Sequence, residues 1–336
     1  MRALLCTEFG PVEKLHVADL PATPPGEREV TVRVEAAGIN YPDALLVEGR
    51  YQFRPKLPFV PGMELAGVVT AVGAGVTGLR PGDPVMATSQ VGAFAEETRV
   101  AAQRVLRRPV ALAPEVAAAS LVTYATTLYA FKDRAQLQPG EAVLVLGAAG
   151  GVGTAAIEVA KLMGARVMAA ASTDEKLAVC RSLGADETVN YATENLRERL
   201  KAFAPAGVDV VYDPVGGPHS EAALRSTGWN GRFLVIGFAS GEIPRIPLNL
   251  ALLNSRSLLG AYWGDWAGRN PDRSLANLDQ IARWIAAGKV RPVISRRLRL
   301  EEVPGALQDL LQRRVHGKMV VLPSGAGQAS AAERSP

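Results

Sequence analysis

The chain has 336 residues, about twice the usual length of a single domain, so two domains are expected. Hydrophobic residues make up 48% and charged residues 21%, which is typical of a protein with a large core, while two Cys and three His exclude a disulfide framework and a four-cysteine zinc site. The net charge of +4 comes from basic residues scattered among acidic ones, a pattern that argues against a nucleic-acid-binding surface.

Residues 1–110 are predicted to form mostly β-structure. Short apolar runs such as Val30–Val34 and Leu65–Val72 are interrupted by turn sequences such as Pro24-Pro25-Gly26 and Pro81-Gly82-Asp83. The run Val30–Val34 alternates in polarity, as a half-buried strand does.

From Ala117 to about Trp263, strand and helix patterns alternate, which predicts a doubly wound parallel sheet and an α/β fold. The expected strands are Val143–Leu146, Arg166–Ala171, Val208–Tyr212 and Arg232–Ile236, and the expected helices are Thr154–Met163 and Asp174–Leu183. A polar helix over Arg273–Ala287 is expected next, and the Ser/Ala/Gly-rich stretch Ser324–Pro336 is predicted to be a flexible tail.

No segment predicts export or insertion into a membrane. Thr7, Glu8 and Gly10 follow the first residues too soon for a signal peptide to form. The longest uncharged runs, Val116–Phe131 and Ala142–Ile157, are shorter than the roughly 20 residues that span a bilayer. We therefore expect a cytoplasmic protein with no membrane partner.

A glycine-rich turn, Gly147–Gly153, lies between a buried strand and a helix. Such a turn lets the backbone approach a pyrophosphate, and the helix N-terminus adds unpaired N–H groups and the positive end of its dipole. We expect Gly150, Gly151, Val152 and Gly153 to bind a dinucleotide here, although Ala148 stands at the first glycine position of the G-x-G-x-x-G pattern. The alternative is a turn tightened only for packing.

The end of the next strand indicates which dinucleotide binds. NAD sites place an acidic residue there for the ribose 2′-OH, but the strand ends in alanines followed by Ser172, Thr173 and Lys176. Hydroxyl groups and an ammonium favour a 2′-phosphate, so NADPH is expected. Asp174 and Glu175 argue the other way but also suit a helix start; in the alternative interpretation Thr173 is only an N-cap and Lys176 only a solvated charge.

Several motifs, in matching order and spacing over residues 1–322, make the chain resemble the zinc-independent quinone oxidoreductases (zeta-crystallin type) of the medium-chain dehydrogenase/reductase superfamily. These motifs are Ala37-Gly38-Ile39-Asn40-Tyr41-Pro42-Asp43, Pro61-Gly62-Met63-Glu64-Leu65-Ala66-Gly67, Pro81-Gly82-Asp83-Pro84-Val85, Gly147–Gly153, Asp213-Pro214-Val215-Gly216-Gly217 and Val235-Ile236-Gly237-Phe238.

The resemblance implies a GroES-like β domain and a Rossmann domain, with the nicotinamide in the cleft between them. The GroES-like domain would comprise residues 1–124 and 265–323, the Rossmann NADPH-binding domain residues 125–264, and the tail residues 324–336. Members of this family usually pair through the dinucleotide domains, so the resemblance also implies a homodimer or homotetramer.

The chain departs from the zinc-dependent relatives at their metal ligands. Where they have Gly-His-Glu, this chain has Gly62-Met63-Glu64, and it has no cysteine near Asn40–Asp43. A catalytic zinc needs about three protein ligands, which these residues do not supply, so a metal-free site is expected.

Without a Lewis acid, hydride transfer requires an acceptor that is already electrophilic, such as a quinone or an activated alkene. By resemblance, Asn40 and Tyr51 line the substrate side, Thr126, Gly237 and Phe238 lie near the nicotinamide, and Tyr191 lies near the adenosine with Lys176. Each could instead be structural: Asn40 as a turn residue, Tyr51 as a packed aromatic, and Thr126 or its neighbour Thr127 through a bond back to a helix carbonyl.

The leading prediction is an NADPH-dependent quinone reductase that acts on small molecules. An NADPH-dependent enone, alkenal or enoyl-thioester reductase is an alternative, because it needs the same hydride site and differs only in the shape of the substrate cleft. A third possibility is a structural or regulatory protein that binds NADPH with little turnover.

Overall fold

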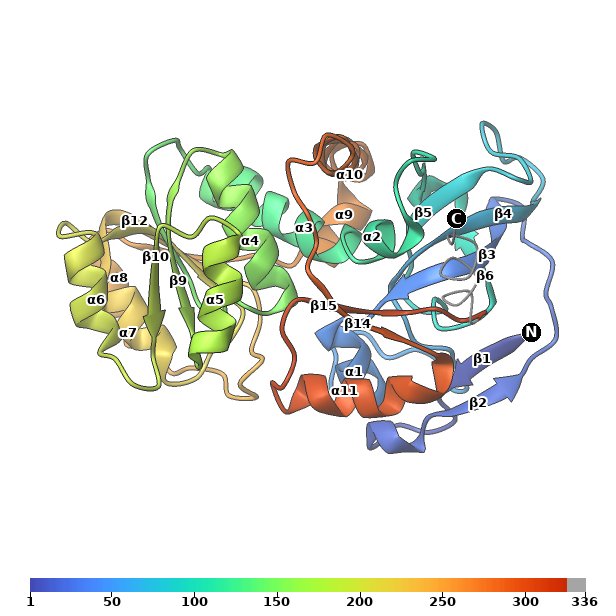
Figure 1. Cartoon of the computed structure of the whole chain (residues 1–336), viewed down its shortest axis with the longest axis horizontal. Coiled ribbons are helices and arrows are strands. Elements are labelled where there is room, and N and C mark those ends of the chain that lie inside the picture. Colours follow the sequence, from blue (N-terminus) through green and yellow to red (C-terminus); the bar gives the residue numbers. More distant parts are fainter. Residues whose placement is uncertain (325–336) are drawn as a thin grey trace, which may run out of the picture. The chain divides into compact units, whose positions relative to one another are not determined.

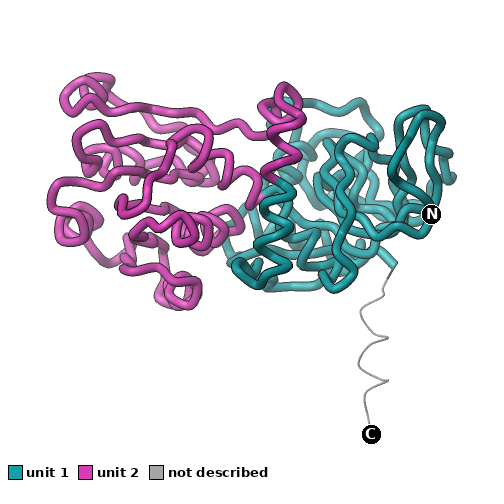
Figure 2. The backbone as a smooth tube through the Cα atoms, turned by 90° about the horizontal axis from the view of Figure 1, so that it is seen from above, with its two compact units in different colours: residues 1–122, 278–336 teal, residues 123–277 magenta. Residues whose placement is uncertain are grey.

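The computed structural model describes residues 1–324, so the predicted tail lies, apart from Ser324, outside the described residues. The chain forms two compact units (Figure 2). Unit 1 consists of Met1–Val122 and the segment that begins at Leu278, and unit 2 is Thr123–Asn277.

Unit 2 is built on a six-stranded parallel sheet with the strand order β10-β9-β8-β11-β12-β13. The strands are β8 (Ala142–Val145), β9 (Arg166–Ala171), β10 (Glu187–Asn190), β11 (Val208–Asp213), β12 (Thr227–Val235) and β13 (Ser257–Gly260). The central strands are continuous apolar runs because helices cover both faces of a parallel sheet. This arrangement confirms the predicted α/β fold.

The helices of unit 2 that connect the strands lie on the two faces of this sheet (Figure 1). They are α4 (Gly151–Leu162) and α5 (Asp174–Ser182), which precede β9 and β10, and α6 (Leu196–Phe203), α7 (His219–Arg225) and α8 (Asn249–Leu253). The strand order reverses at β8, because α4 and α5 lead outward to β10 and α6 leads back to β11. In open parallel sheets, ligands bind beyond the carboxyl ends of the strands at such a reversal.

The remaining helices of unit 2 explain why its boundary differs from the sequence-based one at residue 264. They are α3 (Leu121–Leu128), the π-helix η3 (Tyr129–Ala135), α9 (Trp263–Arg269) and the start of α10 (Pro271–Ala286). Trp266 stacks on Tyr129 with 4.4 Å between ring centroids, and Lys132 donates a hydrogen bond to Asn277. These contacts hold α9 and the first turns of α10 in unit 2 as far as Asn277.

Unit 1 is a mainly antiparallel β-structure, and its second chain segment contributes two strands of the sheet. The seven-stranded sheet has the order β14-β15-β3-β4-β5-β7, and β6 also pairs with β3. Its strands are β3 (Glu29–Gly38), β4 (Glu64–Val72), β5 (Pro84–Thr88), β6 (Glu97–Ala101), β7 (Val105–Arg107), β14 (Ile294–Leu298) and β15 (Lys318–Val321), and a separate hairpin pairs β1 (Arg2–Leu5) with β2 (His16–Asp19).

Short helices close the core of unit 1. They are η1 (Val12–Lys14), α1 (Tyr41–Val47), η2 (Ala102–Arg104), α2 (Pro114–Ala118), η4 (Leu300–Glu302) and α11 (Val303–Leu311). Side chains of β3, β4 and β15 pack with α1 and α11 in one buried apolar cluster. Within the part of the chain that the structure describes, no helix has the length and apolar character needed to cross a membrane.

Candidate functional site

The loops that follow β8, β11 and β12 converge at the carboxyl edge of the sheet in unit 2. Gly147, directly after β8, has a φ of +55°, and a methyl group added to it would lie 2.6 Å from Cγ2 of Val215 in the loop after β11. Only glycine allows both this backbone conformation and this approach. The predicted phosphate turn therefore lies directly against the Asp213–Gly217 loop.

The glycine turn presents a helix N-terminus without a side-chain cap. Gly150 is the N-cap of α4 and is extended, with φ −74° and ψ 171°, and no side chain hydrogen-bonds there. The first N–H groups of a helix have no partner within it, so this end suits an anion. A methyl group on Gly153 would lie 2.4 Å from the carbonyl oxygen of Gly147, so the turn closes tightly on itself.

Asp213, at the end of β11, shapes the loop that covers this turn. It is 2% exposed and accepts hydrogen bonds from the N–H groups of Val215 (2.8 Å) and Gly216 (2.9 Å) and from Oγ of Ser220 (2.6 Å). These side-chain hydrogen bonds lie within the loop and the start of α7, while the backbone carbonyl of Asp213 accepts from the N–H of Ile236 (2.9 Å). Asp213 therefore stabilises the conformation of this loop, and both oxygens of its carboxylate already accept hydrogen bonds.

The loop after β12 brings Gly237 and Phe238 to the same edge. The N–H of Ala239 donates to the carbonyl of Pro214 (3.0 Å), and the N–H of Ser240 donates to that of Val215 (2.8 Å). The Phe238 ring lies so close to Gly216 that a methyl group there would be 2.9 Å from Cδ1 of Phe238. Within unit 2 the structure therefore brings these two predicted residues together with the glycine turn.

The residues predicted to bind the 2′-phosphate lie at and near the end of β9. Ser172 and Lys176 are half-buried, and Oγ1 of Thr173 accepts a hydrogen bond from the N–H of Lys176 (3.3 Å), so Thr173 does serve as an N-cap. Asp174 accepts a hydrogen bond from the side-chain amide of Asn190 (3.1 Å). This hydrogen bond engages Asp174, one of the two acidic residues that argue against a phosphate.

Tyr191, the fourth residue of this predicted group, is held next to Ser172 by its backbone. Its N–H donates to the carbonyl of Ala171 at 3.1 Å. Its side chain is half-buried at the edge of the apolar core of unit 2. The structure thus brings Ser172, Thr173, Lys176 and Tyr191 to neighbouring strand ends.

Helix α3 contains two adjacent threonines with different surroundings. Thr127 is fully buried, and its hydroxyl lies 3.0 Å from that of Tyr212 and 3.5 Å from the carbonyl of Val152 in the glycine turn. Burial raises the pKa of Tyr212, so this hydroxyl stays protonated. Thr127 thus fixes α3 against the turn, while Thr126 is half-buried.

In unit 1, the predicted site residue Asn40 belongs to a buried polar cluster. We call Asn40, Asp43, Glu64 and Lys318 the buried cluster; none of them is more than 5% exposed. The ammonium of Lys318 donates to Oδ1 of Asn40 (2.6 Å), to Oε1 of Glu64 (2.7 Å) and to the carbonyl of Ile39 (2.7 Å). Nδ2 of Asn40 donates to Oε1 of Glu64 at 2.8 Å. The amide of Asn40 is therefore engaged at both ends.

The two carboxylates of the buried cluster differ in their partners. Glu64 pairs directly with Lys318 and also accepts from the N–H of Val122 (2.8 Å). Asp43 accepts from the N–H of Asn40 (2.7 Å), but its Oδ1 is buried without a hydrogen-bond partner. Burial raises the pKa of Asp43 to about 7, although the N–H of Asn40 and the charge of Lys318 oppose the shift.

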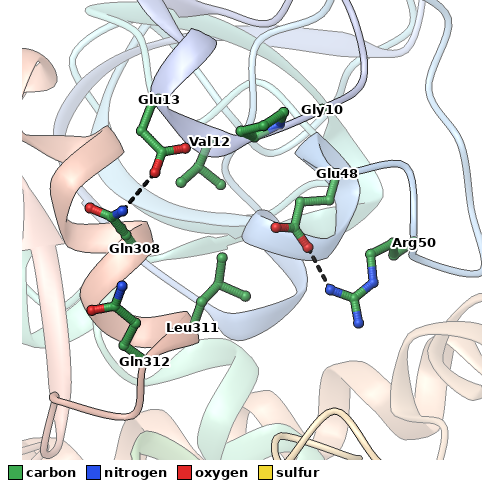
Figure 3. Close-up of a pocket in the computed structure, with 9 residues that line it drawn as sticks. Gly10, Val12, Glu13, Glu48, Arg50, Gln308, Leu311 and Gln312 are labelled. Carbon is green, nitrogen blue, oxygen red and sulfur yellow. Dashed lines mark hydrogen bonds and ion pairs between the residues drawn. The ribbon is translucent and has the colours of Figure 1, made fainter.

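Tyr51, the other predicted residue on the substrate side, is half-buried and packs against the core of unit 1. Close to it in sequence, Arg50 donates a hydrogen bond of 2.8 Å to Glu48 on one wall of an open depression of about 430 Å³ (Figure 3). Gln308 closes the opposite wall through a hydrogen bond of 2.7 Å to Glu13. Because no predicted site residue lines this depression, it is separate from the candidate site.

Sequence reasoning missed Lys318, Thr127 and the role of Asp213. Lys318 had a detectable signal, since it is a single cation in the otherwise apolar strand β15. Its partners lie 254 to 279 residues away in the sequence, so no local pattern points to them. Asp213 lies inside a quoted motif and Thr127 is the neighbour of the predicted Thr126, but only the fold shows which atoms they contact.

Two family models match the chain, one before and one after residue 150. The alcohol dehydrogenase GroES-like domain model matches residues 26–110, and the zinc-binding dehydrogenase model matches residues 151–280. Together these domains make up the architecture of a medium-chain dehydrogenase/reductase. The quinone oxidoreductase-like protein 2 homolog of Nematostella vectensis is 38% identical over 325 residues, covering 95% of this chain and 88% of that protein. The chain therefore belongs to the quinone oxidoreductase branch of this superfamily, which confirms the prediction from its motifs.

Solved structures are similar over nearly the whole chain. The Escherichia coli quinone oxidoreductase complexed with NADPH has a TM-score of 0.90 at 28% identity, covering 96% of this chain and 100% of that one. The mycobacterial protein Rv1454c complexed with NADPH has a TM-score of 0.90 at 31% identity, with the same coverage. Both neighbours are NADPH complexes.

Proposed function

We propose that the protein is an NADPH-dependent reductase that transfers hydride to a quinone without a metal ion. The observation that carries this proposal is the buried cluster: the ammonium of Lys318 is bonded to Asn40 and Glu64, which belong to the two motifs in which the zinc-dependent relatives carry metal ligands. The family membership and the NADPH complexes of similar proteins support the oxidoreductase class and the cofactor.

The residues of unit 2 fit NADPH. The uncapped start of α4 at Gly150, Gly151, Val152 and Gly153 would hold the pyrophosphate. Ser172, Thr173, Lys176 and Tyr191 would hold the phosphorylated ribose, because hydroxyl and ammonium groups are donors for a phosphate. Thr126, Gly237 and Phe238 would contact the nicotinamide. When bound, NADPH supplies the hydride.

The residues of unit 1 do not fit a zinc ion. Among residues 1–324, no three His, Cys, Asp or Glu side chains are grouped so that they could hold a metal. Glu64 has Lys318 at 2.7 Å, and Met63 offers only a thioether at the position of the histidine ligand. A zinc ion beside this ammonium would be repelled by its charge.

This chemistry favours an acceptor that needs no Lewis acid. A quinone takes one hydride from NADPH and one proton from water, which yields the hydroquinone and NADP⁺. The chain's own contributions would be position and hydrogen bonds that stabilise the developing oxyanion. Tyr51 is the proposed donor, and Asn40, whose amide is engaged, would act by fixing the β3–α1 junction.

We also propose that the protein forms a homodimer through the edge of the sheet in unit 2. Among the strands of residues 1–324, β13 pairs with β12 alone, and it exposes Leu258. Nearby in the chain, Leu252 and Leu253 are 79% and 64% exposed, an amount of apolar surface that favours a partner. Light scattering of the purified protein tests this assembly.

A panel of acceptors tests the function. NADPH oxidation is measured with 1,4-benzoquinone, 9,10-phenanthrenequinone, trans-2-hexenal and crotonyl-CoA, before and after dialysis against a chelator. We expect the quinones to give the highest kcat/KM and the chelator to have no effect. Faster reduction of the alkenes would replace the quinone assignment, loss of activity on chelation would contradict the metal-free site, and tight NADPH binding without turnover would favour a non-catalytic role.

Two variants test the proposed acceptor side. Tyr51→Phe removes only a hydroxyl, so we expect kcat/KM for the best quinone to fall about tenfold while the KM for NADPH is unchanged. Asn40→Ala should lower both kcat/KM and stability, because its amide joins two members of the buried cluster. If neither variant changes kcat/KM, the assignment of these residues is wrong.

A further inference from the structure

His219 is placed against one of the proposed cofactor residues, although no motif pointed to it. It is the first residue of α7, directly after the Asp213–Gly217 loop and Pro218. Its ring lies 4.4 Å from the ring of Tyr191, centroid to centroid, with the planes tilted by 37°. This contact connects the loop after β11 with the segment after β10.

The contact lies close to the proposed ribose site. The backbone N–H of Tyr191, just after β10, is hydrogen-bonded to Ala171, the residue before Ser172. Tyr191 therefore lies beside the end of β9. His219 meets the ring of Tyr191 from the opposite loop. The backbone of Tyr191 is fixed by its hydrogen bond to Ala171, and the ring packs against His219. The ring therefore has little freedom to turn, and His219 can set the position of the Tyr191 hydroxyl.

The surroundings of His219 favour its neutral form in the free protein. It is half-buried, and burial lowers its pKa, while the charge of Asp213 partly opposes the shift. On its own helix Glu221 is engaged by Arg225 at 2.7 Å, and the facing titratable side chain is Tyr191. In the free protein His219 is therefore neutral at pH 7.

We propose that His219 is a positioning residue for Tyr191 and that a proton on His219 strengthens the preference for NADPH over NADH. The inference rests on the proposed 2′-phosphate site. A protonated imidazole next to the Tyr191 ring adds a positive charge near a dianionic phosphate, which NADH lacks. By linkage, whatever favours NADPH when His219 is protonated also favours protonation of His219 when NADPH is bound. The preference for NADPH should therefore rise as the pH falls from 8 to 6.

The phosphate itself also titrates, with a second pKa of about 6, and its protonation weakens binding at low pH. This effect is common to the wild type and to every variant. The effect of His219 is thus the difference in pH dependence between the wild type and a variant that keeps an aromatic ring at position 219.

The test measures the dissociation constants of NADPH and NADH from pH 6 to pH 8 for the wild type, His219→Phe, His219→Ala and Lys176→Ala. Between pH 8 and pH 6, we expect the Kd ratio of NADH to NADPH to rise about fivefold more in the wild type than in His219→Phe. His219→Ala, which also loses the ring contact, should show a lower ratio than His219→Phe at every pH. His316, one of the two exposed histidines of unit 1, provides the matched control His316→Phe, which should behave as the wild type does.

Equal pH dependence in the wild type and His219→Phe would overturn the role of the charge, and equal ratios in His219→Phe and His219→Ala would overturn the positioning role. A wild type without preference for NADPH at any pH, with no effect of Lys176→Ala, would instead refute the proposed 2′-phosphate site and the inference with it. A ratio that falls in Lys176→Ala while both His219 variants match the wild type would refute the inference alone.

Discussion

In unit 2 the glycine turn that is proposed to bind the pyrophosphate offers backbone groups, whereas in unit 1 the polar residues of the predicted substrate side are side chains bonded to one another. The glycine turn after β8 leaves the start of α4 uncapped, and Asp213 is consumed in shaping the loop above it. In unit 1, Asn40 and Glu64 share the ammonium of Lys318. The glycine turn leaves the first N–H groups of α4 without a side-chain cap, whereas Asn40, Glu64 and Lys318 use their polar groups internally.

This contrast shows that position within a family motif does not by itself make a residue a ligand contact. Buried polar groups must be paired, because an unpaired one costs about 1–3 kcal/mol. In the buried cluster Asn40, Glu64 and Lys318 meet this requirement through one another's side chains, whereas Asp43 accepts from the N–H of Asn40. Substitutions there should change stability first, while substitutions in the glycine turn should change cofactor binding as well.

The largest effect is expected for Lys318→Met, which breaks the cluster in unit 1. The variant leaves Glu64 buried without its cation, and removal of one partner of a buried ion pair costs about 3–5 kcal/mol. Denaturant unfolding should show a loss of this size. The exposed Lys289 provides the matched control, and Lys289→Met should change stability by less than about 0.5 kcal/mol.

A double variant separates the missing cation from the lost packing. Lys318→Met with Glu64→Gln has no buried charge at this pair, and a glutamine can still accept the N–H of Val122. It should therefore be more stable than Lys318→Met alone. A single variant that loses less than about 1 kcal/mol would show that the cluster does not hold unit 1 together.

The second effect concerns the glycine turn of unit 2. In Gly153→Ala the new methyl group would lie 2.4 Å from the carbonyl oxygen of Gly147 and 2.7 Å from backbone atoms of Ala148, so the turn must open. We expect a loss of about 1–3 kcal/mol in stability and a rise of at least tenfold in the Kd of NADPH. Gly268→Ala on α9 is the control, since a methyl group there meets nothing within 4 Å; it should leave the Kd unchanged. An unchanged Kd of NADPH in Gly153→Ala would show that the glycine turn does not contribute to cofactor binding.

The sequence predicts the two regions unequally, for physical reasons. Strand β9 has the predicted bounds, Arg166–Ala171, and the glycine turn lies where expected, because a parallel strand buried on both faces is a continuous apolar run and its tight turn requires glycine. These patterns are local and can be recognised in a single sequence.

The buried cluster could not be predicted in this way. Its hydrogen bonds join Lys318 to residues near positions 40 and 64, which only the tertiary fold brings together. The same limit applies to the boundary of unit 2, because Trp266 and Asn277 are held there by side-chain contacts to η3. For Asn40, the sequence indicates its motif but not that its amide is already engaged.

The smallest expected effect is a pH dependence of stability that arises from Asp43 in unit 1. The pKa of Asp43 is raised to about 7 in the folded protein from 3.8, so between these values the folded state holds a proton that the unfolded state lacks. Stability from this group is therefore present at low pH and is lost as the pH rises toward 7. Asp43→Asn cannot titrate, so the wild type should lose about 1–2 kcal/mol relative to the variant between pH 6 and pH 8 in urea unfolding.

The physical reason is the charge balance of the buried cluster, in which two carboxyl groups share one ammonium. Lys318 bonds directly to Glu64, while Asp43 accepts from the N–H of Asn40 and leaves Oδ1 without a partner. One ammonium offsets one carboxylate, so the second carboxyl group is the one that takes up a proton as the pH falls. A stability difference that is constant from pH 6 to pH 8 would show that Asp43 stays ionised, and then the N–H of Asn40 and the charge of Lys318 suffice to hold both carboxylates in the core of unit 1.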